Sequence, residues 1–399
     1  MTPGQRLAAF GVALGLIAAP LSGLSAQSAG ALNAKAVRIM GGDYGSSDLR
    51  MVVDLADMLA ANSEVRVVPM VGQGSARNLE DLLFLKGVDI TVVQSDVLDF
   101  YRRNELIADI DQRIRYIAKL NDKEVHLLAR TAYPEVDALA GARVNFGRED
   151  SGSFMASGII FQDLGIEVDV TTYDDDEALA KLKAGEIDAM LTVDGAPIDR
   201  IAKLSPTDGV HLLSLPNDRI SAAYLPAQLT TETYPQMIKS YAPVETVAVG
   251  VVLAAYNWTD DSPRAGALDG FIKALFGHFD ELKAAGYHAK WQDVDLAETL
   301  PEWQRMASAE AGRRQVLDST VQYGRYLSFE CIACHHPAEA DGAIPVIAAL
   351  PAPYFVNALK SYRSGLRHNL VMKDVAASLD DEQIKALSVY YQSMREAEQ

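Results

Sequence analysis

Short apolar runs alternate with helical stretches over residues 35–256, and this alternation constrains the fold more than any other feature of the chain. Strands and helices that alternate at this spacing form βαβ units with parallel sheets. About 220 residues of this pattern exceed one typical domain of ~100–150 residues, so we predict two α/β lobes. The predicted strands are residues 36–40, 65–70, 89–93, 125–129, 143–146 and 187–193. The predicted helices between them are residues 47–61, 77–85, 153–164 and 176–184, and a further helical stretch follows at 264–285.

The last part of the chain, residues 312–399, has a purely helical pattern. Helices are predicted over 313–329, 354–364 and 380–394. Asp380 and Gln383 have the spacing of a capping box at the start of the last helix, and Gly365 is placed to end the middle one. We predict a separate small all-α domain, near the size at which an apolar core alone is barely sufficient.

The two cysteines of the chain lie three residues apart in the run Cys331-Ile332-Ala333-Cys334-His335. Two thiols at this spacing can add to the two vinyl groups of a haem, and the adjacent histidine can then reach the iron. The motif predicts one covalent haem c held by Cys331, Cys334 and His335, and such a haem would fill the small core. Two alternatives stay open. A thioredoxin-like pair would need a βαβ context, and a zinc site would need a fourth ligand such as His336 or His368.

Residues 331–394 resemble small bacterial class I cytochromes c that exchange electrons in the periplasm. The resemblance rests on the run 362–372 (Tyr-Arg-Ser-Gly-Leu-Arg-His-Asn-Leu-Val-Met) and on residues 376–387 that follow it. It implies that Met372, in a loop-like stretch, is the second axial ligand, and that the neighbourhood of Pro345 supports His335 through its backbone. His368, Met394 and an open site are the alternatives. The histidine-proline pair after the motif, where the family has glycine, and the short stretch between His335 and Met372 depart from the family pattern.

The N-terminus has the three parts of a cleaved secretory signal, with Arg6, an apolar stretch over 7–21 and small residues up to Ala26. We expect residues 1–26 to be removed and the mature protein to be periplasmic, without a membrane span of its own. The net charge of −18 excludes nucleic acid as a partner, because phosphate binding needs a basic surface.

Residues 35–305 resemble the TAXI-type solute receptors of TRAP transporters, which are two-lobed periplasmic binding proteins. The resemblance rests on clusters at 40–46, 72–79, 87–89, 93–96, 147, 151–153, 188–189 and 194–197, most of which follow a predicted strand and precede a helix. Helix N-termini and polar side chains at such places can hold a carboxylate, although the same residues are common in ordinary turns. The best candidates for the cleft are Tyr44, Ser75, Asn78, Gln94, Ser151 and Ser153.

These features predict a two-lobed periplasmic-binding-protein-like domain followed by a cytochrome c domain. The first functional hypothesis is a periplasmic electron carrier whose receptor-like domain binds a small carboxylate or docks a redox partner protein. The second is a TRAP-type solute receptor that serves a membrane permease and carries an accessory haem. The third, an enzyme that oxidises a bound solute, lacks a visible acid/base pair, so the sequence favours a carrier or binding protein over an enzyme.

Overall fold

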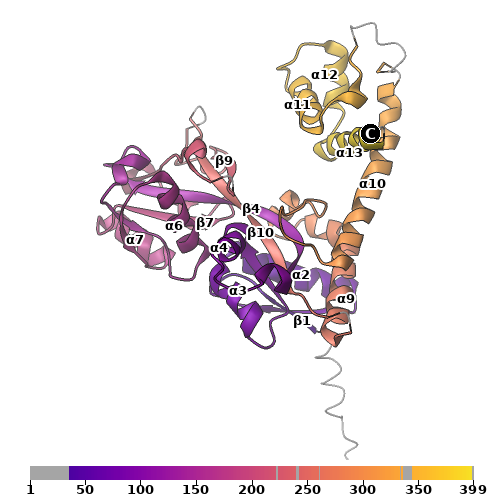
Figure 1. Cartoon of the computed structure of the whole chain (residues 1–399). Coiled ribbons are helices and arrows are strands. Elements are labelled where there is room, and N and C mark those ends of the chain that lie inside the picture. Colours follow the sequence, from indigo (N-terminus) through magenta and orange to yellow (C-terminus); the bar gives the residue numbers. More distant parts are fainter. Residues whose placement is uncertain are drawn as a thin grey trace, which may run out of the picture.

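The computed structural model describes residues 36–221, 223–239, 242–259, 261–332, 334–335 and 344–397. The predicted signal peptide, residues 1–26, lies outside the described residues. Two α/β lobes form the larger part of the molecule, and a small group of helices stands beyond them at the end of one long helix (Figure 1). The helical pattern predicted from residue 312 onward corresponds to this long helix and the small helical group.

The strands of both lobes belong to one mixed sheet with the order β2-β1-β3-β10-β4-β7-β5-β6, in which β8 pairs with β4 and β9 with β10. The first five strands are β1 (Ala36–Met40), β2 (Arg66–Met70), β3 (Ile90–Gln94), β4 (Ile114–Arg130) and β5 (Arg143–Asn145). The other five are β6 (Asp169–Thr171), β7 (Ala189–Asp194), β8 (Val210–Leu212), β9 (Leu225–Leu229) and β10 (Val244–Tyr256).

Two long strands, β4 and β10, join the lobes. β4 pairs with β10 over residues 114–124 and with β7 over 124–129, while β10 also pairs with β3 and β9, and all four pairings are antiparallel. Only the outer pairs β1–β2, β1–β3, β5–β6 and β5–β7 are parallel. The predicted parallel pairing is thus present in the outer strands of each lobe, whereas the antiparallel centre of the sheet was not predicted.

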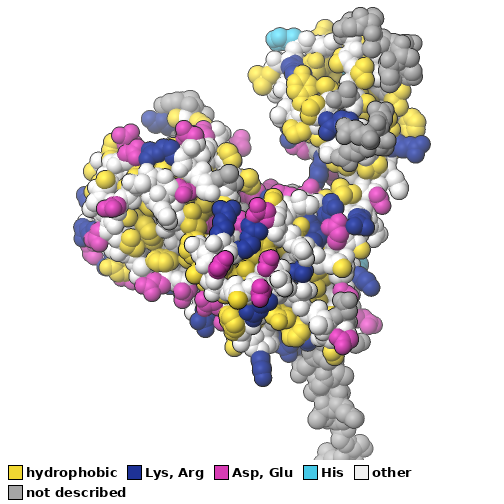
Figure 2. Space-filling model, viewed as in Figure 1, with side chains coloured by type: hydrophobic (Ala, Val, Ile, Leu, Met, Phe, Trp, Pro, Cys, Tyr) yellow, Lys and Arg dark blue, Asp and Glu magenta, His cyan; other side chains and the backbone are white. Residues whose placement is uncertain are grey.

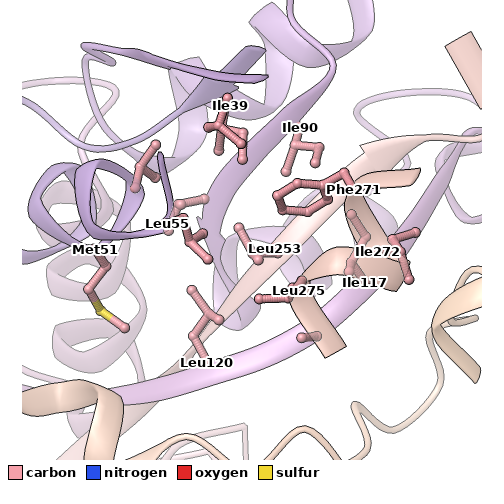
Figure 3. Close-up of a cluster of buried hydrophobic side chains, with 14 of the residues drawn as sticks. Ile39, Met51, Leu55, Ile90, Ile117, Leu120, Leu253, Phe271, Ile272 and Leu275 are labelled. Atoms are coloured by element: carbon pink, nitrogen blue, oxygen red, sulfur yellow. The ribbon is translucent and has the colours of Figure 1, made fainter. Parts of the chain in front are cut away.

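Helices cover both lobes, and their apolar faces supply the cores. The helices are α2 (Ser47–Asn62), α3 (Ser75–Phe84), α4 (Ser95–Arg103), α5 (Ile110–Arg113), α6 (Gly152–Leu164), α7 (Asp175–Ala184), α8 (Asp199–Ala202) and α9 (Pro263–His278). In the first lobe, α2 and α9 pack on one face of the sheet, where Met51, Leu55 and Phe271 meet Ile39 and Leu253 (Figure 3). The predicted helix over 264–285 ends earlier, since α9 gives way to a 3-10 turn at Phe279–Lys283.

Helix α10 (Ala307–Ile332) connects the lobes to the small helical domain. Its 26 residues correspond to a length of about 39 Å. Ala309, in its first turn, belongs to the core of the first lobe, whereas its far half packs on α13 (Asp381–Ala397). Gly324 allows this crossing, because a Cβ there would lie 2.0 Å from the carbonyl oxygen of Ala386. The predicted start of the helical domain, residue 312, thus lies inside a helix that both parts share.

The helical domain consists of the end of α10 together with α11 (Ala352–Arg363), α12 (Leu370–Ala377) and α13. The predicted capping box is confirmed: Gln383 N donates to Asp380 Oδ1 at 2.8 Å, and Asp380 N donates to Gln383 Oε1 at 3.0 Å. Gly365 has φ +80° just after α11, as a helix-ending glycine does. An ion pair of 2.5 Å between Lys385 Nζ and Asp295 Oδ2 ties this domain to the α/β part.

Candidate functional site

A cavity of about 280 Å³ lies between the two lobes, where loops at the carboxyl ends of strands face each other. The first lobe contributes the loop after β1, the loop after β2 and the end of β3. The second lobe contributes the loop after β5, the start of α7 and the end of β7. This is the position at which α/β proteins bind small ligands.

Five of the six predicted cleft residues line this cavity: Tyr44, Ser75, Gln94, Ser151 and Ser153. Tyr44 is 92% exposed and Gln94 only 2% exposed, so one lies at the rim and the other at the base of the loops.

Asn78 does not line the cavity. It is buried behind the loop after β2, where Nδ2 donates to Gly41 O at 2.6 Å and to Val92 O at 3.3 Å, and Oδ1 accepts from Gln73 N at 3.2 Å. Its amide therefore shapes the loop, and the prediction of a ligand contact for Asn78 was wrong.

The three predicted serines use their hydroxyl oxygens within the protein. Ser151 caps α6 by accepting from Phe154 N at 3.0 Å, as the alternative of ordinary turn chemistry implied. Ser153 Oγ accepts from Val193 N at 3.0 Å, and Ser75 Oγ accepts from Gln94 N at 3.2 Å. Each hydroxyl keeps a proton that it can donate.

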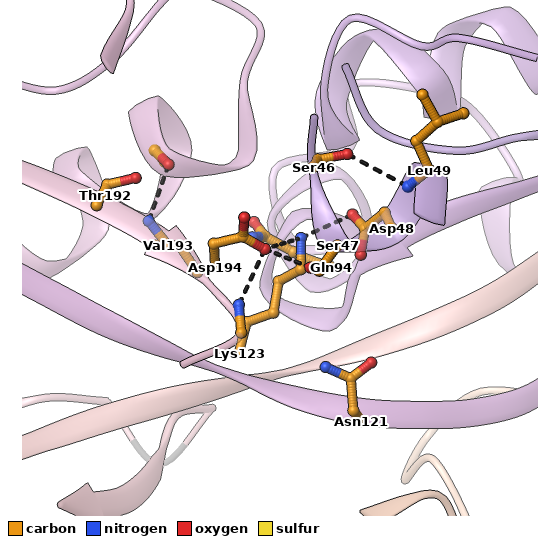
Figure 4. Close-up of polar contacts among 12 residues, drawn as sticks. Ser46, Ser47, Asp48, Leu49, Gln94, Asn121, Lys123, Thr192, Val193 and Asp194 are labelled. Carbon is orange, nitrogen blue, oxygen red and sulfur yellow. Dashed lines mark hydrogen bonds and ion pairs between the residues drawn. The ribbon is translucent and has the colours of Figure 1, made fainter. Parts of the chain in front are cut away.

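A buried ion-pair network at the base of the cavity was missed by the sequence analysis. Lys123, from the middle of β4, places Nζ 2.7 Å from Asp48 Oδ2 and 3.3 Å from Asp194 Oδ1 (Figure 4). Ser47 Oγ also donates to Asp194. Burial opposes the charge of Lys123, but the two carboxylates raise its pKa above the ordinary value. No sequence signal singles out this network, because Lys123 lies in a polar run of β4 with Asn121, Asp122 and Glu124 beside it.

Further contacts hold the lobes against each other. Arg148 in the second lobe donates from Nη2 to Asp43 Oδ2 at 3.3 Å and to Gln73 O at 3.1 Å in the first. Tyr224 donates to Asp96 Oδ2 at 2.7 Å, and burial nevertheless raises the pKa of Asp96 to about 6. The lobes are thus in direct polar contact around the cavity.

The segment with the two cysteines lies at the end of α10 and continues its last turn. Cys334 N and His335 N donate to Cys331 O at 3.3 and 2.9 Å. The imidazole of His335 places Nδ1 2.8 Å from Pro345 O. When Nδ1 carries the proton, this bond fixes the ring and leaves Nε2 as the free nitrogen.

The surroundings of the cysteines differ from those of a thiol-exchange site. The segment follows a long helix and no strand, so the βαβ context of a thioredoxin-like pair is missing. Burial raises the pKa of the Cys331 thiol, whereas reactive thiols have a lowered pKa. Among the residues that the structure describes, no three His, Cys, Asp or Glu side chains converge on a metal position. His336, one of the predicted zinc ligands, lies outside the described residues.

Met372 lies in helix α12, so the predicted loop-like setting was wrong. Asn369 begins this helix by accepting a hydrogen bond from Met372 N at 3.0 Å. Met372 and Cys331 are both partly buried and pack against the same apolar cluster, whose buried members include Phe355, Leu387 and Tyr391. The structure therefore brings the predicted axial methionine and the first cysteine to one small core.

Apolar side chains are exposed around this core (Figure 2). Leu366 and Leu370 are 81% and 82% exposed, and the described part of the helical domain exposes several others: Tyr323, Tyr326, Phe329, Ile332, Ile344, Tyr354, Val371 and Met394. Exposed apolar patches of this kind are typical of sites that interact with a ligand or another protein.

The model of the NMT1-like family matches residues 40–301, about two thirds of the chain. The chain belongs to the NMT1-like family. With two α/β lobes and a cavity between them, its NMT1-like domain is a solute-binding-receptor-like domain.

Solved structures similar to the chain have low identities. PhnD1 from Prochlorococcus marinus, in complex with methylphosphonate, is 11% identical with a TM-score of 0.42, covering 65% of this chain and 95% of that one. A TctC solute binding protein from Polaromonas is 14% identical (TM-score 0.38, coverage 63% and 90%). The periplasmic aliphatic sulphonate binding protein SsuA from Escherichia coli is 16% identical (TM-score 0.38, coverage 62% and 73%).

One curated protein, a thiosulfate dehydrogenase electron acceptor from Thiomonas intermedia, is 35% identical over 71 residues. The match covers 16% of this chain and 31% of that protein, so the chain spans about a third of the length of this relative. No helix among the described residues has the length and apolarity needed to cross a membrane.

The walls of the cavity in the NMT1-like domain are acidic. Six aspartates line it, against three basic side chains, and each of the three basic groups forms an ion pair with one or two of the aspartates. The aspartates are Asp43, Asp48, Asp174, Asp175, Asp176 and Asp194, and the basic residues are Lys123, Arg148 and Arg200. A charged solute therefore meets a surface whose positive charges are already engaged.

Proposed function

We propose that this chain is a periplasmic c-type cytochrome that transfers single electrons and whose NMT1-like domain binds a solute. The observation that carries the haem assignment is the hydrogen-bond distance between His335 Nδ1 and Pro345 O. A histidine that binds iron through Nε2 is usually held by such a bond on its other nitrogen. This contact is what a haem-binding role of His335 leads one to expect, and it supports the proposal.

The residues around the motif fit a haem. Cys331 and Cys334 would hold it by thioether bonds, and His335 and Met372 would face the iron. Exposed apolar side chains such as Leu366, Leu370 and Val371 would contact the macrocycle and exclude water from it. The bound haem supplies one-electron chemistry, and a histidine-methionine pair leaves no open position on it.

Export supports the proposal independently. Covalent haem of this type is attached outside the cytoplasm, and the N-terminal 26 residues have the pattern of a secretory signal. The similarity to an electron acceptor of a thiosulfate dehydrogenase supports a periplasmic redox protein as the partner.

A redox titration of the full chain, produced with c-type haem maturation, tests the proposal. We expect one reversible one-electron step. The variant Met372→Ala should lower the midpoint potential and abolish the sulfur-to-iron absorption band, because it removes the sulfur ligand. Met394→Ala, a methionine of the last helix, is the matched control and should leave both unchanged. Equal behaviour of the two variants would contradict Met372 as ligand, and absence of any redox step would contradict the cytochrome function.

The second candidate is a transport receptor of the TAXI type that serves a TRAP-type permease, with the haem as an accessory. The cavity of the NMT1-like domain favours it. The fold suits a solute receptor, but the cavity is less suited to the predicted small carboxylate. Its basic groups already form ion pairs with aspartates. Loss of solute uptake on deletion of the gene, with unchanged periplasmic electron transfer, would favour this second function.

A further inference from the structure

Gln94 lies at the carboxyl end of β3 with its side chain at the cavity. It is 2% exposed, and its Oε1 accepts no hydrogen bond from any described residue. A buried amide oxygen without a donor is unfavourable, because it has lost its hydrogen bonds to water without gaining another. A polar group that is buried at a cavity and left without a partner is positioned to meet a ligand.

Asp48, at the start of α2, lines the same cavity and has a second unused acceptor. Its Oδ2 binds Lys123 Nζ at 2.7 Å, while Oδ1 is buried and without a donor among the described residues. Gln94 and Asp48 come from different elements of the first lobe, so the two observations are independent. Oδ1 of Asp48 can be satisfied only by a donor, because a carboxylate has no proton to offer.

The charges around these two residues disfavour an anion. Lys123 is shared by Asp48 and Asp194, and Arg200 is paired with Asp175 and Asp176. The amino end of α7 could attract an anion through its free N–H groups. Its own cap occupies that place, since Asp174 Oδ1 accepts from Glu177 N at 2.9 Å.

We propose that the cavity binds a small organic cation that carries N–H donors, an ammonium or guanidinium compound, and not a carboxylate. This inference rests on the proposed solute-binding role of the NMT1-like domain and is independent of the haem. The donors of the cation would satisfy Gln94 Oε1 and Asp48 Oδ1, and its charge would offset the surplus of aspartates. Charge-assisted hydrogen bonds of this kind are about twice as strong as neutral ones.

Calorimetric titration of the full, haem-loaded protein tests the inference with four probes. Putrescine and agmatine carry N–H donors and positive charge. The fully N-methylated analogue of putrescine keeps the charge without the donors, and succinate has the opposite charge at similar length. We expect putrescine or agmatine to bind and the other two to bind at least tenfold more weakly.

Two variants test whether Asp48 and Gln94 contact the bound amine. Asp48→Asn and Gln94→Leu should each weaken the bound amine about tenfold, which corresponds to the loss of one charge-assisted hydrogen bond. Asp57→Asn is the matched control, because Asp57 is exposed on the same helix, and it should bind as the wild type does. If Asp48→Asn does not fold, Gln94→Leu alone carries the test.

Preferred binding of succinate would overturn the inference and leave the solute-binding role intact. Equal binding of putrescine and its methylated analogue would overturn the need for donors, and with it the inference. Binding of none of the probes at about 10 mM would overturn the inference and leave the solute-binding role to be tested with other solutes. In every case the haem spectrum of the same sample reports separately on the cytochrome function.

Discussion

The two parts of this molecule achieve stability in different ways. The first lobe alone buries a cluster of 26 apolar residues between its sheet and helices. The main cluster of the helical domain contains six buried residues, while ten of the seventeen large hydrophobic side chains that are exposed in the described chain lie between residues 323 and 394. The first lobe buries its large apolar side chains within the polypeptide, whereas the helical domain leaves many of its own exposed, and under the proposed function a haem covers them. Four sets of variants test this difference.

Removing the thiols should have the largest effect. In the double variant Cys331→Ala/Cys334→Ala we expect no covalent haem. We also expect loss of the cooperative melting transition of the helical domain, because its apolar side chains no longer have the haem to pack against. The free energy of unfolding of the NMT1-like domain should change by less than about 0.5 kcal/mol. Differential scanning calorimetry measures both, and an unchanged helical transition would contradict the comparison.

The reciprocal change is Phe271→Ala in the first lobe. Phe271 is fully buried against the sheet, so we expect a loss of about 3–5 kcal/mol in the NMT1-like domain. The haem spectrum of the helical domain should not change. Phe84→Ala, an exposed phenylalanine on α3, is the control and should cost about 0.5 kcal/mol or less. Chemical unfolding followed by tryptophan fluorescence distinguishes the two variants.

The pH dependence of stability should also differ between the parts. Burial raises the pKa of Asp96 from its ordinary 3.8 to about 6, so the folded state holds this proton more tightly than the unfolded state. Its contribution to stability is complete below about pH 4 and is lost as the pH rises through 6, up to about 3 kcal/mol.

Asp96→Asn should remove this pH-dependent contribution. The free energy of unfolding of the NMT1-like domain should therefore fall less steeply between pH 4 and 7 in the variant than in the wild type. The measurement is unfolding between pH 4 and 7, and parallel pH profiles of the two proteins would show that Asp96 does not titrate in this way.

The smallest effect concerns the packing of α10, which connects the two parts, against α13. A Cβ at Gly324 would meet the backbone of Ala386, so Gly324→Ala should destabilise the packing of α10 on α13 by about 1–3 kcal/mol. Gly270→Ala in α9 has open space around it and should stabilise its helix by about 0.5–1 kcal/mol. Thermal melting of both variants checks the pair, and equal shifts would argue against close packing at Gly324.

Elements with strong periodic patterns could be predicted from sequence, and elements set by the tertiary arrangement could not. The strands β1, β2, β3 and β7 and the capping box at Asp380 follow from local patterns. The long strand β10 was missed, because a continuous apolar run does not distinguish a strand from a helix. Its antiparallel pairing depends on where the chain crosses between lobes.

The site shows the same division. Ser151 and Gln94 could be placed at the cleft because they follow predicted strands, whereas Lys123 could not, since a lysine among the other polar residues of β4 gives no sign of its partners. Asn78 was misassigned for the same reason: its position after a strand is right, but its amide faces the backbone of its own lobe. Side-chain direction decides such roles, and the pattern of residue types does not contain it.

The intact mass of the mature protein, purified from the periplasm of a host that matures c-type haem, tests the central claim most directly. We expect a chain that lacks its first 26 residues and carries the mass of one haem, which remains after denaturation in acid. A chain of the unmodified mass, with two free thiols at Cys331 and Cys334, would contradict it.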